Sequence, residues 1–260
     1  LGLFYRLNYN FKNKYLLELN GRYDGSSKFP YNQRFGFFPS VSAGWNISEE
    51  PFMESWKTWL DNLKLRTSYG SLGNGNVEPY KYLETMSVTK ANVILGGIQP
   101  GYTYLPAVLP DGLTWERSTT FNVGIDLTML NSRLSSTFEW YHRSTTDMFT
   151  LGQPLPSVFG ATVPFGNYAD LSTKGWEISL SWRDNIQLGR KSLNYSFSGS
   201  LWDNSATITK FNNPTKTLAS TYYEGHKIGE IWGYETLGFF TSEEDVATHA
   251  NQNFLQNSNS

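Results

Sequence analysis

The sequence predicts an all-β fold: an antiparallel, up-and-down transmembrane β-barrel segment of about eight to nine strands, with short turns at one end and long loops at the other. Three observations predict it. Apolar and polar residues alternate with a period of two along one segment after another, aromatic residues gather at the segment ends, and short connections alternate with long ones. We expect residues 1–260 to form part of one larger barrel domain.

Alternation identifies the individual strands. Near the start of the chain, Leu17 and Leu19 lie on one face of an extended segment and Glu18 lies on the other. The same pattern predicts strands over residues 15–23, 37–47, 63–69, 121–127 and 176–182. The face expected to be apolar carries Leu17, Leu19, Val41, Val123, Ile125, Ile178 and Leu180. The face expected to be polar carries Glu18, Arg22, Arg66, Asp126, Glu177 and Arg183.

Aromatic residues are numerous, with 9 Trp, 16 Tyr and 17 Phe, and many of them stand at strand ends. Rings with an apolar body and a polar tip favour the headgroup level of a bilayer, where membrane barrels carry aromatic girdles. Aromatic residues also favour strands in general and fill the cores of soluble sandwiches, whose polar faces meet bulk water. Alternation and aromatic content therefore leave both a membrane barrel and a soluble sandwich open.

Connection lengths favour the membrane barrel, because its turns are short on one side and its loops are long on the other. The connections expected to be short cover residues 11–14, 130–133 and 184–192. The connections expected to be long cover residues 26–35, 71–117 and 144–172. We expect the short turns, at Lys12, Ser132 and Asn185, to be periplasmic and the two longest loops to be extracellular.

Residues 48–62 are an exception, since this connection is long but falls on the side of the short turns. Ser48 is suited to cap a helix whose first turn carries Glu49 and Glu50, so a short helix is expected there. The count then reaches about eight strands by Trp202, each near the ~9–11 residues that a tilted spanning strand requires. A ninth strand is expected within residues 228–240.

Composition excludes several classes of protein. No stretch approaches the ~20 continuous apolar residues of a spanning helix. Cysteine is absent, which excludes a disulfide framework and a zinc site of cysteine ligands. The net charge of −2 offers no basic field for nucleic acid. The chain begins in a strand without an initiator Met, and it ends in a polar tract, so we expect it to be a fragment of a longer protein.

Six blocks of the sequence resemble the barrel region of the SusC/RagA family of TonB-dependent outer-membrane transporters. Each block alone is a generic strand with a turn, but the series is highly specific because the blocks keep the family's order and cover most of the chain outside the long loops. The blocks are YLLELNGRYDGSSKF (Tyr15 to Phe29), RFGFFPSVSAGWNISEEPFM (Arg34 to Met53), NLKLRTSYGSLGN (Asn62 to Asn74), LTWERSTTFNVGIDLTMLNSRLSSTFEWYHRSTTDMF (Leu113 to Phe149), LSTKGWEISLSWR (Leu171 to Arg183) and EGHKIGEIWGYETLGFF (Glu224 to Phe240).

The resemblance implies a large barrel, closed inside by an amino-terminal plug, that imports glycan oligosaccharides, peptides or other nutrients across the outer membrane of Bacteroidota. It implies three partners: a SusD-like lipoprotein that lids the barrel from outside, the TonB system, which acts through the amino-terminal part, and outer-membrane lipid. The family's signal peptide, TonB-contacting segment, plug and final strands are not found in this chain. The resemblance therefore places the chain within the barrel wall.

The sequence offers no coherent catalytic or metal site, and we expect neither enzymatic activity nor a cofactor. His142, His226 and His249 fall in unrelated contexts, without the spacing of a ligand pair. His142 is expected at a strand end beside Trp140, where an interfacial histidine is the ordinary interpretation. The GRKS at residues 189–192 lacks the upstream glycine of a phosphate loop and is interpreted as a turn.

Binding is better supported than catalysis, because aromatic residues with neighbouring glycines are concentrated in the long connections. Such rings can stack on sugars or on peptide side chains, although they can equally pack the loops against one another or against the lipoprotein. The residues expected to contact ligand are Tyr80, Tyr82, Tyr102, Tyr104, Phe159, Tyr168, Trp232 and Tyr234. An alternative function is a β-rich carbohydrate-binding module at the cell surface, which would be soluble where a barrel segment requires detergent.

Overall fold

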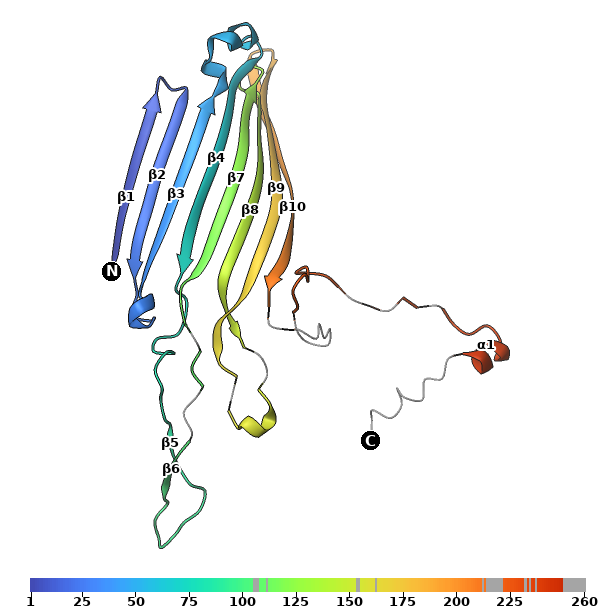
Figure 1. The fold of residues 1–260 in the computed structure, drawn as a ribbon. Helices are drawn as coiled ribbons and strands as arrows, with labels where there is room; N and C mark the ends of the chain where they lie inside the picture. The colour runs from blue at the N-terminus through green and yellow to red at the C-terminus, as the bar shows by residue number, and fades with distance from the viewer. Residues whose placement is uncertain are drawn as a thin grey trace. The chain divides into compact units, whose positions relative to one another are not determined.

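A computed structural model describes residues 1–104, 108–110, 112–152, 155–161, 163–211, 213, 222–231, 233, 235–236 and 238–249 (Figure 1). The chain divides into two compact units, Leu1–Ile228 and Gly229–Ser260. In the second unit, a short helix α1 (Glu243–Thr248) begins after Ser242, whose Oγ accepts a hydrogen bond from the backbone N–H of Asp245 at 3.1 Å. Within the described part of the chain, no helix is long and apolar enough to cross a membrane.

The first unit is built on one antiparallel sheet of eight strands in the order β1-β2-β3-β4-β7-β8-β9-β10. Each strand pairs with its neighbours in chain order, so the sheet is an up-and-down meander with β1 and β10 at its edges, and the expected fold class is confirmed (Figure 1). The strands are β1 (Gly2–Phe11), β2 (Tyr15–Gly25), β3 (Phe35–Asn46), β4 (Leu60–Asn74), β7 (Glu116–Met129), β8 (Leu134–Leu151), β9 (Phe165–Leu188) and β10 (Lys191–Lys210). Strands β5 (Val88–Lys90) and β6 (Gly101–Thr103) form a separate small hairpin.

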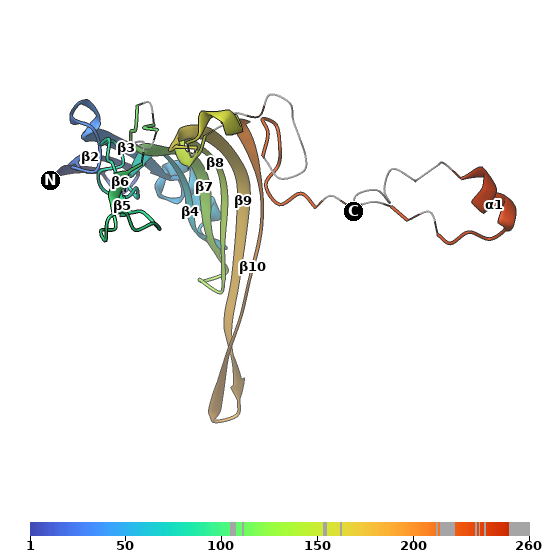
Figure 2. The same cartoon turned by 90° about the horizontal axis from the view of Figure 1, so that it is seen from below.

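The strands are staggered relative to one another. A row of paired residues starts at Phe11 and Tyr15, beside the first turn, and reaches Ile178 in β9. Leu188, the end of β9, lies about ten residues beyond Ile178, and the β9–β10 hairpin extends past the other strands (Figure 2). The register row therefore moves away from the turn end from one strand to the next, as it does in barrels whose strands are tilted.

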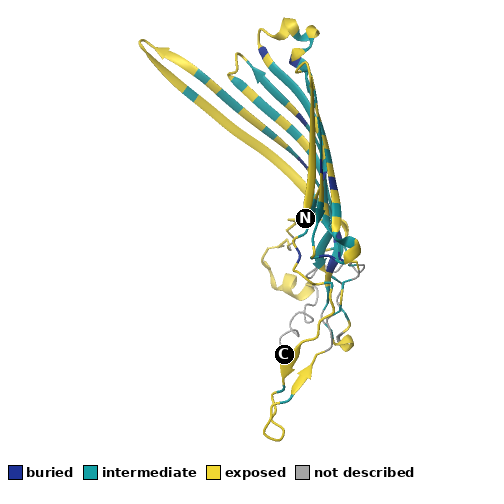
Figure 3. Ribbon diagram, turned by 90° about the vertical axis from the view of Figure 1, so that its left-hand side faces the viewer, coloured by how far each residue is buried: buried dark blue, intermediate teal, exposed yellow. Residues whose placement is uncertain are grey.

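The two faces of the sheet have the composition that alternation predicts. The pairing register places Leu19 beside Val41, and Ile125 in the same row as Ile178. All seven residues predicted to be apolar-facing share one face, and all six predicted to be polar-facing share the other. We call these the apolar face and the polar face. The sheet is a single layer, so its buried residues are few and scattered (Figure 3).

The tight turns lie at one end of the sheet and the connections 26–34, 75–115 and 152–164 at the other, with residues 47–59 as a long connection at the turn end (Figure 1). The turn at 130–133 has the predicted bounds and the one predicted over 11–14 covers 12–14, but three predictions were too long, the first being 71–117, which covers only 75–115. Strands β8 and β9 continue to Leu151 and from Phe165, so the loop predicted over 144–172 covers only 152–164. Likewise β9 continues to Leu188, which places Asn185 within a strand and reduces the turn to residues 189–190. These strands continue past their alternating segments through runs of polar residues. In those runs the sequence has no alternation of apolar and polar residues to show where strand pairing stops.

One further element prediction holds only in part, and another was wrong. Residues 47–56 form two 3-10 helices, η2 (Ile47–Glu49) and η3 (Pro51–Trp56), and Ser48 caps neither. Ser48 is buried and donates its hydroxyl to Oδ1 of Asn62 at 3.2 Å, because the loop folds back onto the start of β4. The described residues within 228–240 form no strand.

Candidate functional site

The loop end of the sheet is held together by a small apolar core. Phe29 and Leu113 are fully buried there, and Val77 completes the cluster. The ring of Trp115 lies 4.8 Å from the ring of Phe29 and 5.6 Å from that of Phe38, measured between centroids. This core joins the connection after β2 to both ends of the connection between β4 and β7, and thereby fixes the bases of two loops.

Hydrogen bonds fix the base of the third loop, between β8 and β9, to the other two loops. Thr114 donates its hydroxyl to Oε1 of Gln33 at 3.1 Å. The amide of Asn167 in β9 bonds the backbone of Thr114 twice, accepting from its N–H at 2.9 Å and donating to its carbonyl at 3.0 Å. Asn167 also donates to the carbonyl of Asp147, a residue with φ +56° at the irregular pairing of β8. The bases of the three loops at the loop end are therefore connected to one another.

Four of the aromatic residues predicted to bind ligand are exposed at this end. Tyr102 and Tyr104 form one pair, with their hydroxyl oxygens 2.7 Å apart and their rings in a T-shaped contact at 5.1 Å. This hydrogen bond raises the pKa of Tyr102 above its ordinary value. Tyr102 lies in β6, although the sequence predicted no strand there. Tyr80, with φ +64°, and Phe159, the last residue of η4 (Ser157–Phe159), are separate from this pair.

The other four predicted residues differ from these. Tyr82 packs against the apolar core, and its hydroxyl donates to the carbonyl of Ser27 at 3.4 Å. Tyr168 lies in β9 and not in a loop, with its ring over Gly166, where a Cβ would come within 2.7 Å of the ring. Trp232 and Tyr234 lie outside the described residues. The six predicted aromatic residues that the structure describes are thus not brought together into one site.

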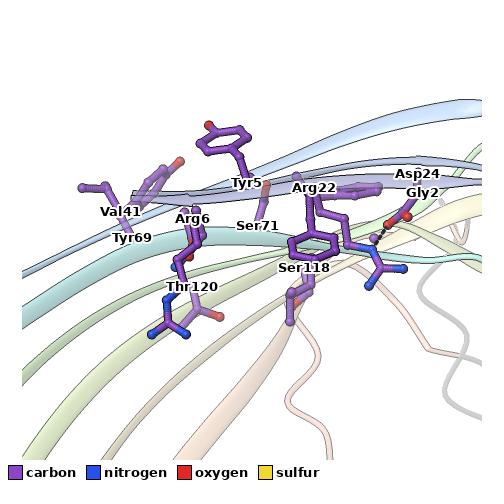
Figure 4. Close-up of a pocket in the computed structure, with 18 of the residues that line it drawn as sticks. Gly2, Tyr5, Arg6, Arg22, Asp24, Val41, Tyr69, Ser71, Ser118 and Thr120 are labelled. Atoms are coloured by element: carbon purple, nitrogen blue, oxygen red, sulfur yellow. Dashed lines mark hydrogen bonds and ion pairs between the residues drawn. The ribbon is translucent and has the colours of Figure 1, made fainter. Parts of the chain in front are cut away.

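A cleft on the polar face was not predicted (Figure 4). It has a volume of about 1070 Å³ and extends from β1 to β7 near the loop end. Arg6, Arg22 and Thr120 lie on one side of the sheet in Figure 4, whereas Tyr5 and Tyr69 point to the other. Its floor is made of small residues of β3 and β4, namely Ser40, Ser42, Ser68 and Gly70. Within the floor, Ser or Gly recurs at every second position of these two strands. This repeat was the signal in the sequence for a cleft on this face.

A second cavity of about 890 Å³ lies between the two longest loops. Its lining is mainly apolar and includes Val77, Leu83 and Phe149, and Tyr80 is the one predicted ligand contact among the residues that line it. An ion pair between Glu78 and Lys81, at 2.8 Å, lies beside it and lowers the pKa of Glu78. The loop end therefore offers an apolar recess in addition to the polar cleft.

The polar face carries paired charges along the strands. Arg6 pairs with Glu18 at 2.7 Å and Arg22 with Asp24 at 2.5 Å. Nearer the turns, Arg66 contacts Asp126 at 3.2 Å and also Glu139. Charges on this scale are compatible with a wet interior and are costly in contact with hydrocarbon. Among the described residues, no group of His, Asp and Glu has the arrangement of a metal site.

Residues 1–257 match the family described as "TonB dependent receptor-like, beta-barrel". The chain belongs to this family. The resemblance to SusC/RagA transporters is confirmed by relatives and by solved structures. The family consists of receptors and not of enzymes.

Three curated relatives of this TonB-dependent receptor chain come from two bacteria. TonB-dependent receptor P26 of Formosa agariphila is 39% identical over 180 residues, which cover 69% of this chain and 18% of the relative. TonB-dependent receptor P39 of the same organism is 31% identical over 272 residues, covering 98% and 25%. TonB-dependent receptor SusC of Bacteroides thetaiotaomicron is 34% identical over 187 residues, covering 70% and 18%. The chain thus spans a quarter or less of these relatives.

Solved structures agree with the family. The structure of the RagAB peptide transporter superposes with a TM-score of 0.71 and 27% identity, over 81% of this chain and 22% of that chain. The RagAB peptide importer in its "open-open" state superposes with a TM-score of 0.66. The eight-stranded sheet therefore has the fold of part of a TonB-dependent receptor barrel.

Proposed function

We propose that this chain forms part of the wall and external vestibule of an outer-membrane importer, which takes up a nutrient through the TonB system. The observation that carries the proposal is the pairing of a mainly apolar face with a charged, hollowed polar face on a sheet whose longest connection, residues 75–115, lies at the end opposite the tight turns. A barrel wall requires this arrangement, because lipid covers one face and water or a plug meets the other.

The nutrient is proposed to be a glycan oligosaccharide or a peptide. Both the relative named SusC and the structure titled RagAB peptide transporter support an importer of this type. We further propose a SusD-like lipoprotein as lid over the loop end and the TonB system as the driving partner. The exposed rings of Tyr80, Tyr102, Tyr104 and Phe159 are the better candidates for ligand contact, because Tyr82 and Tyr168 already pack within the protein.

The competing proposal, a soluble carbohydrate-binding module, is less well supported. Leu7 and Leu19 lie opposite each other on the apolar face, and Leu7 has 61% of its surface exposed. Water would meet this face in a soluble module, and a continuous exposed apolar sheet face promotes aggregation. In a membrane, lipid covers the apolar face, so its side chains are not exposed to water.

Cysteine labelling of whole cells tests the topology in the intact receptor. Single cysteines at Gly101 in β6 and at Arg190 in the last turn are introduced into a receptor from which any cysteine outside this chain has been replaced, because this chain itself has none. An impermeant maleimide should label Gly101→Cys in intact cells and Arg190→Cys only after the outer membrane is permeabilised. Labelling in the opposite order would overturn the proposed orientation, and labelling of both in intact cells would overturn the membrane placement.

A further inference from the structure

Four aromatic side chains form a band across the apolar face on the side of the loops. Tyr69 in β4 pairs with Phe121 in β7, and Trp140 in β8 pairs with Trp176 in β9. The rings of Phe121 and Trp140 are in T-shaped contact at 6.3 Å, which joins the two pairs. The row of Trp140 and Trp176 lies two residues nearer the turns than the row of Tyr69 and Phe121. Because the strands are tilted, this displacement keeps all four side chains at about the same height above the turns. We call them the aromatic band.

Two basic side chains lie immediately beyond the aromatic band, toward the loops. His142 and Lys174 are paired across β8 and β9, each two residues beyond a tryptophan of the band and therefore on the apolar face. His142 is in the interior of β8, not at a strand end as the sequence suggested. Its Nε2 lies 2.9 Å from the hydroxyl oxygen of Ser172, which holds the imidazole against β9.

The charge of Lys174 is not neutralised within the described part of the chain. Lys174 is exposed, and no carboxylate there lies within ion-pair distance. The acidic residue nearest in register is Asp203 of β10, which pairs with Trp176 and so lies diagonally across from Lys174 on the same face. On the polar face, by contrast, Arg6, Arg22 and Arg66 each have a carboxylate partner. The described residues therefore leave the ammonium of Lys174 without an ion-pair partner.

We propose that Lys174 and His142 bind the phosphate of an outer-leaflet lipid whose acyl chains lie along the aromatic band. Tryptophan and tyrosine mark the headgroup level of a membrane, which is where lipid phosphates are found. A primary ammonium and an imidazole are donors suited to phosphate oxygens, and apolar rings below them suit hydrocarbon. The inference rests on the proposed membrane placement, and it adds a specific lipid contact to it.

The test uses the intact receptor in detergent, with phosphatidic acid and diacylglycerol of the same acyl chains as probes, and native mass spectrometry to count bound lipid. Phosphatidic acid should bind in preference to diacylglycerol, and Lys174→Gln should weaken its binding about fivefold, as expected for one lysine near a headgroup. His142→Gln should weaken it less, and Asp203→Asn should strengthen it by removing a competing negative charge.

Lys64→Gln is the matched control, because it removes the same charge from the polar face. Equal binding by Lys174→Gln and the unmodified receptor would overturn the inference, as would equal binding of the two lipids. Displacement of phosphatidic acid by an equal concentration of inorganic phosphate would also overturn it, because the site would then recognise an anion and not a lipid. The labelling pattern of Gly101→Cys and Arg190→Cys is independent of these outcomes and continues to test the proposed function.

Discussion

Arg66 on β4 and Glu139 on β8 form an ion pair across the whole width of β7. The guanidinium crosses directly over Gly124 of β7, and a Cβ at Gly124 would lie 2.8 Å from Cζ of Arg66. Asn122 donates to the second oxygen of Glu139 at 3.1 Å, and Asp126 accepts from Nε of Arg66 at 3.2 Å. The glycine therefore creates the space that allows one arginine to connect three strands on the polar face.

Gly124→Val should destabilise the sheet by about 1–3 kcal/mol, since its side chain forces Arg66 away from Glu139. The measurement is urea unfolding of the intact receptor in lipid vesicles, followed by tryptophan fluorescence. Gly44→Val in β3 is the control on the same face, because a Cβ there comes no closer than 3.3 Å, to the end of the Lys64 side chain. Equal effects at the two glycines would show that Arg66 does not depend on the space at Gly124.

The apolar face should reject charge much more strongly than the polar face. Leu19→Arg near the middle of β2 is expected to cost ~2–4 kcal/mol, because the guanidinium would enter hydrocarbon. Asn20→Arg, one residue along the same strand, should cost much less, because it points to the polar cleft. Folding yield and urea unfolding in vesicles measure both. Equal tolerance of arginine at the two positions would contradict the assignment of the faces.

Sequence periodicity was sufficient for the sheet and its faces, because each strand is a local pattern. Leu17 and Leu19 report their shared face through spacing alone, whatever their neighbours are. Strand ends are less predictable, because β8 and β9 extend past the apolar belt through polar residues such as Thr146 and Asn185, where pairing no longer depends on a hydrophobic signal. The role of Ser48 could not be predicted from local sequence either, because its hydrogen-bond partner Asn62 is brought near it only by the tertiary fold.

The site was predictable only in outline. Loop aromatic residues were predicted as ligand contacts, but nothing in the sequence separates Tyr82, which packs on the loop core, from Tyr102, which is exposed. The sequence analysis did not predict the polar cleft, because the cleft exists where side chains are small and not where a distinctive residue stands. Its residues are small and come from several strands, so only the register brings them together.

Glu50 should make the turn end of the sheet sensitive to acid. Its carboxylate accepts hydrogen bonds from Tyr15 at 2.7 Å, Lys14 at 3.0 Å and Trp45 at 3.2 Å, and these bonds, the one from Tyr15 above all, lower the pKa of Glu50 below its ordinary value of 4.5. A carboxyl with a lowered pKa in the folded state stabilises the fold above its unfolded pKa, and this contribution disappears as the pH falls through the folded value.

The check is the thermal unfolding midpoint of the intact receptor from neutral to acid pH. Glu50→Gln should lower the midpoint at neutral pH, and the difference from the unmodified receptor should shrink once the pH falls below 4.5. Glu49→Gln, a neighbouring exposed carboxylate, serves as control and should change little. A difference for Glu50→Gln that stays constant with pH would show that the carboxylate charge is not responsible.

Replacement of Tyr102 and Tyr104 together by Ala should weaken ligand binding or uptake by about 1–3 kcal/mol if both rings stack on the ligand. Assembly in the membrane should survive, because the β5–β6 hairpin that carries Tyr102 forms its own small sheet, separate from the eight-stranded one. The double Phe variant is the matched control. It keeps both rings and removes the hydroxyl contact at 2.7 Å, so it should bind nearly as well if stacking dominates. Normal uptake by the double Ala variant in a correctly assembled receptor would assign these rings a structural role, and loss of uptake in both variants would identify the hydroxyls as the ligand contact.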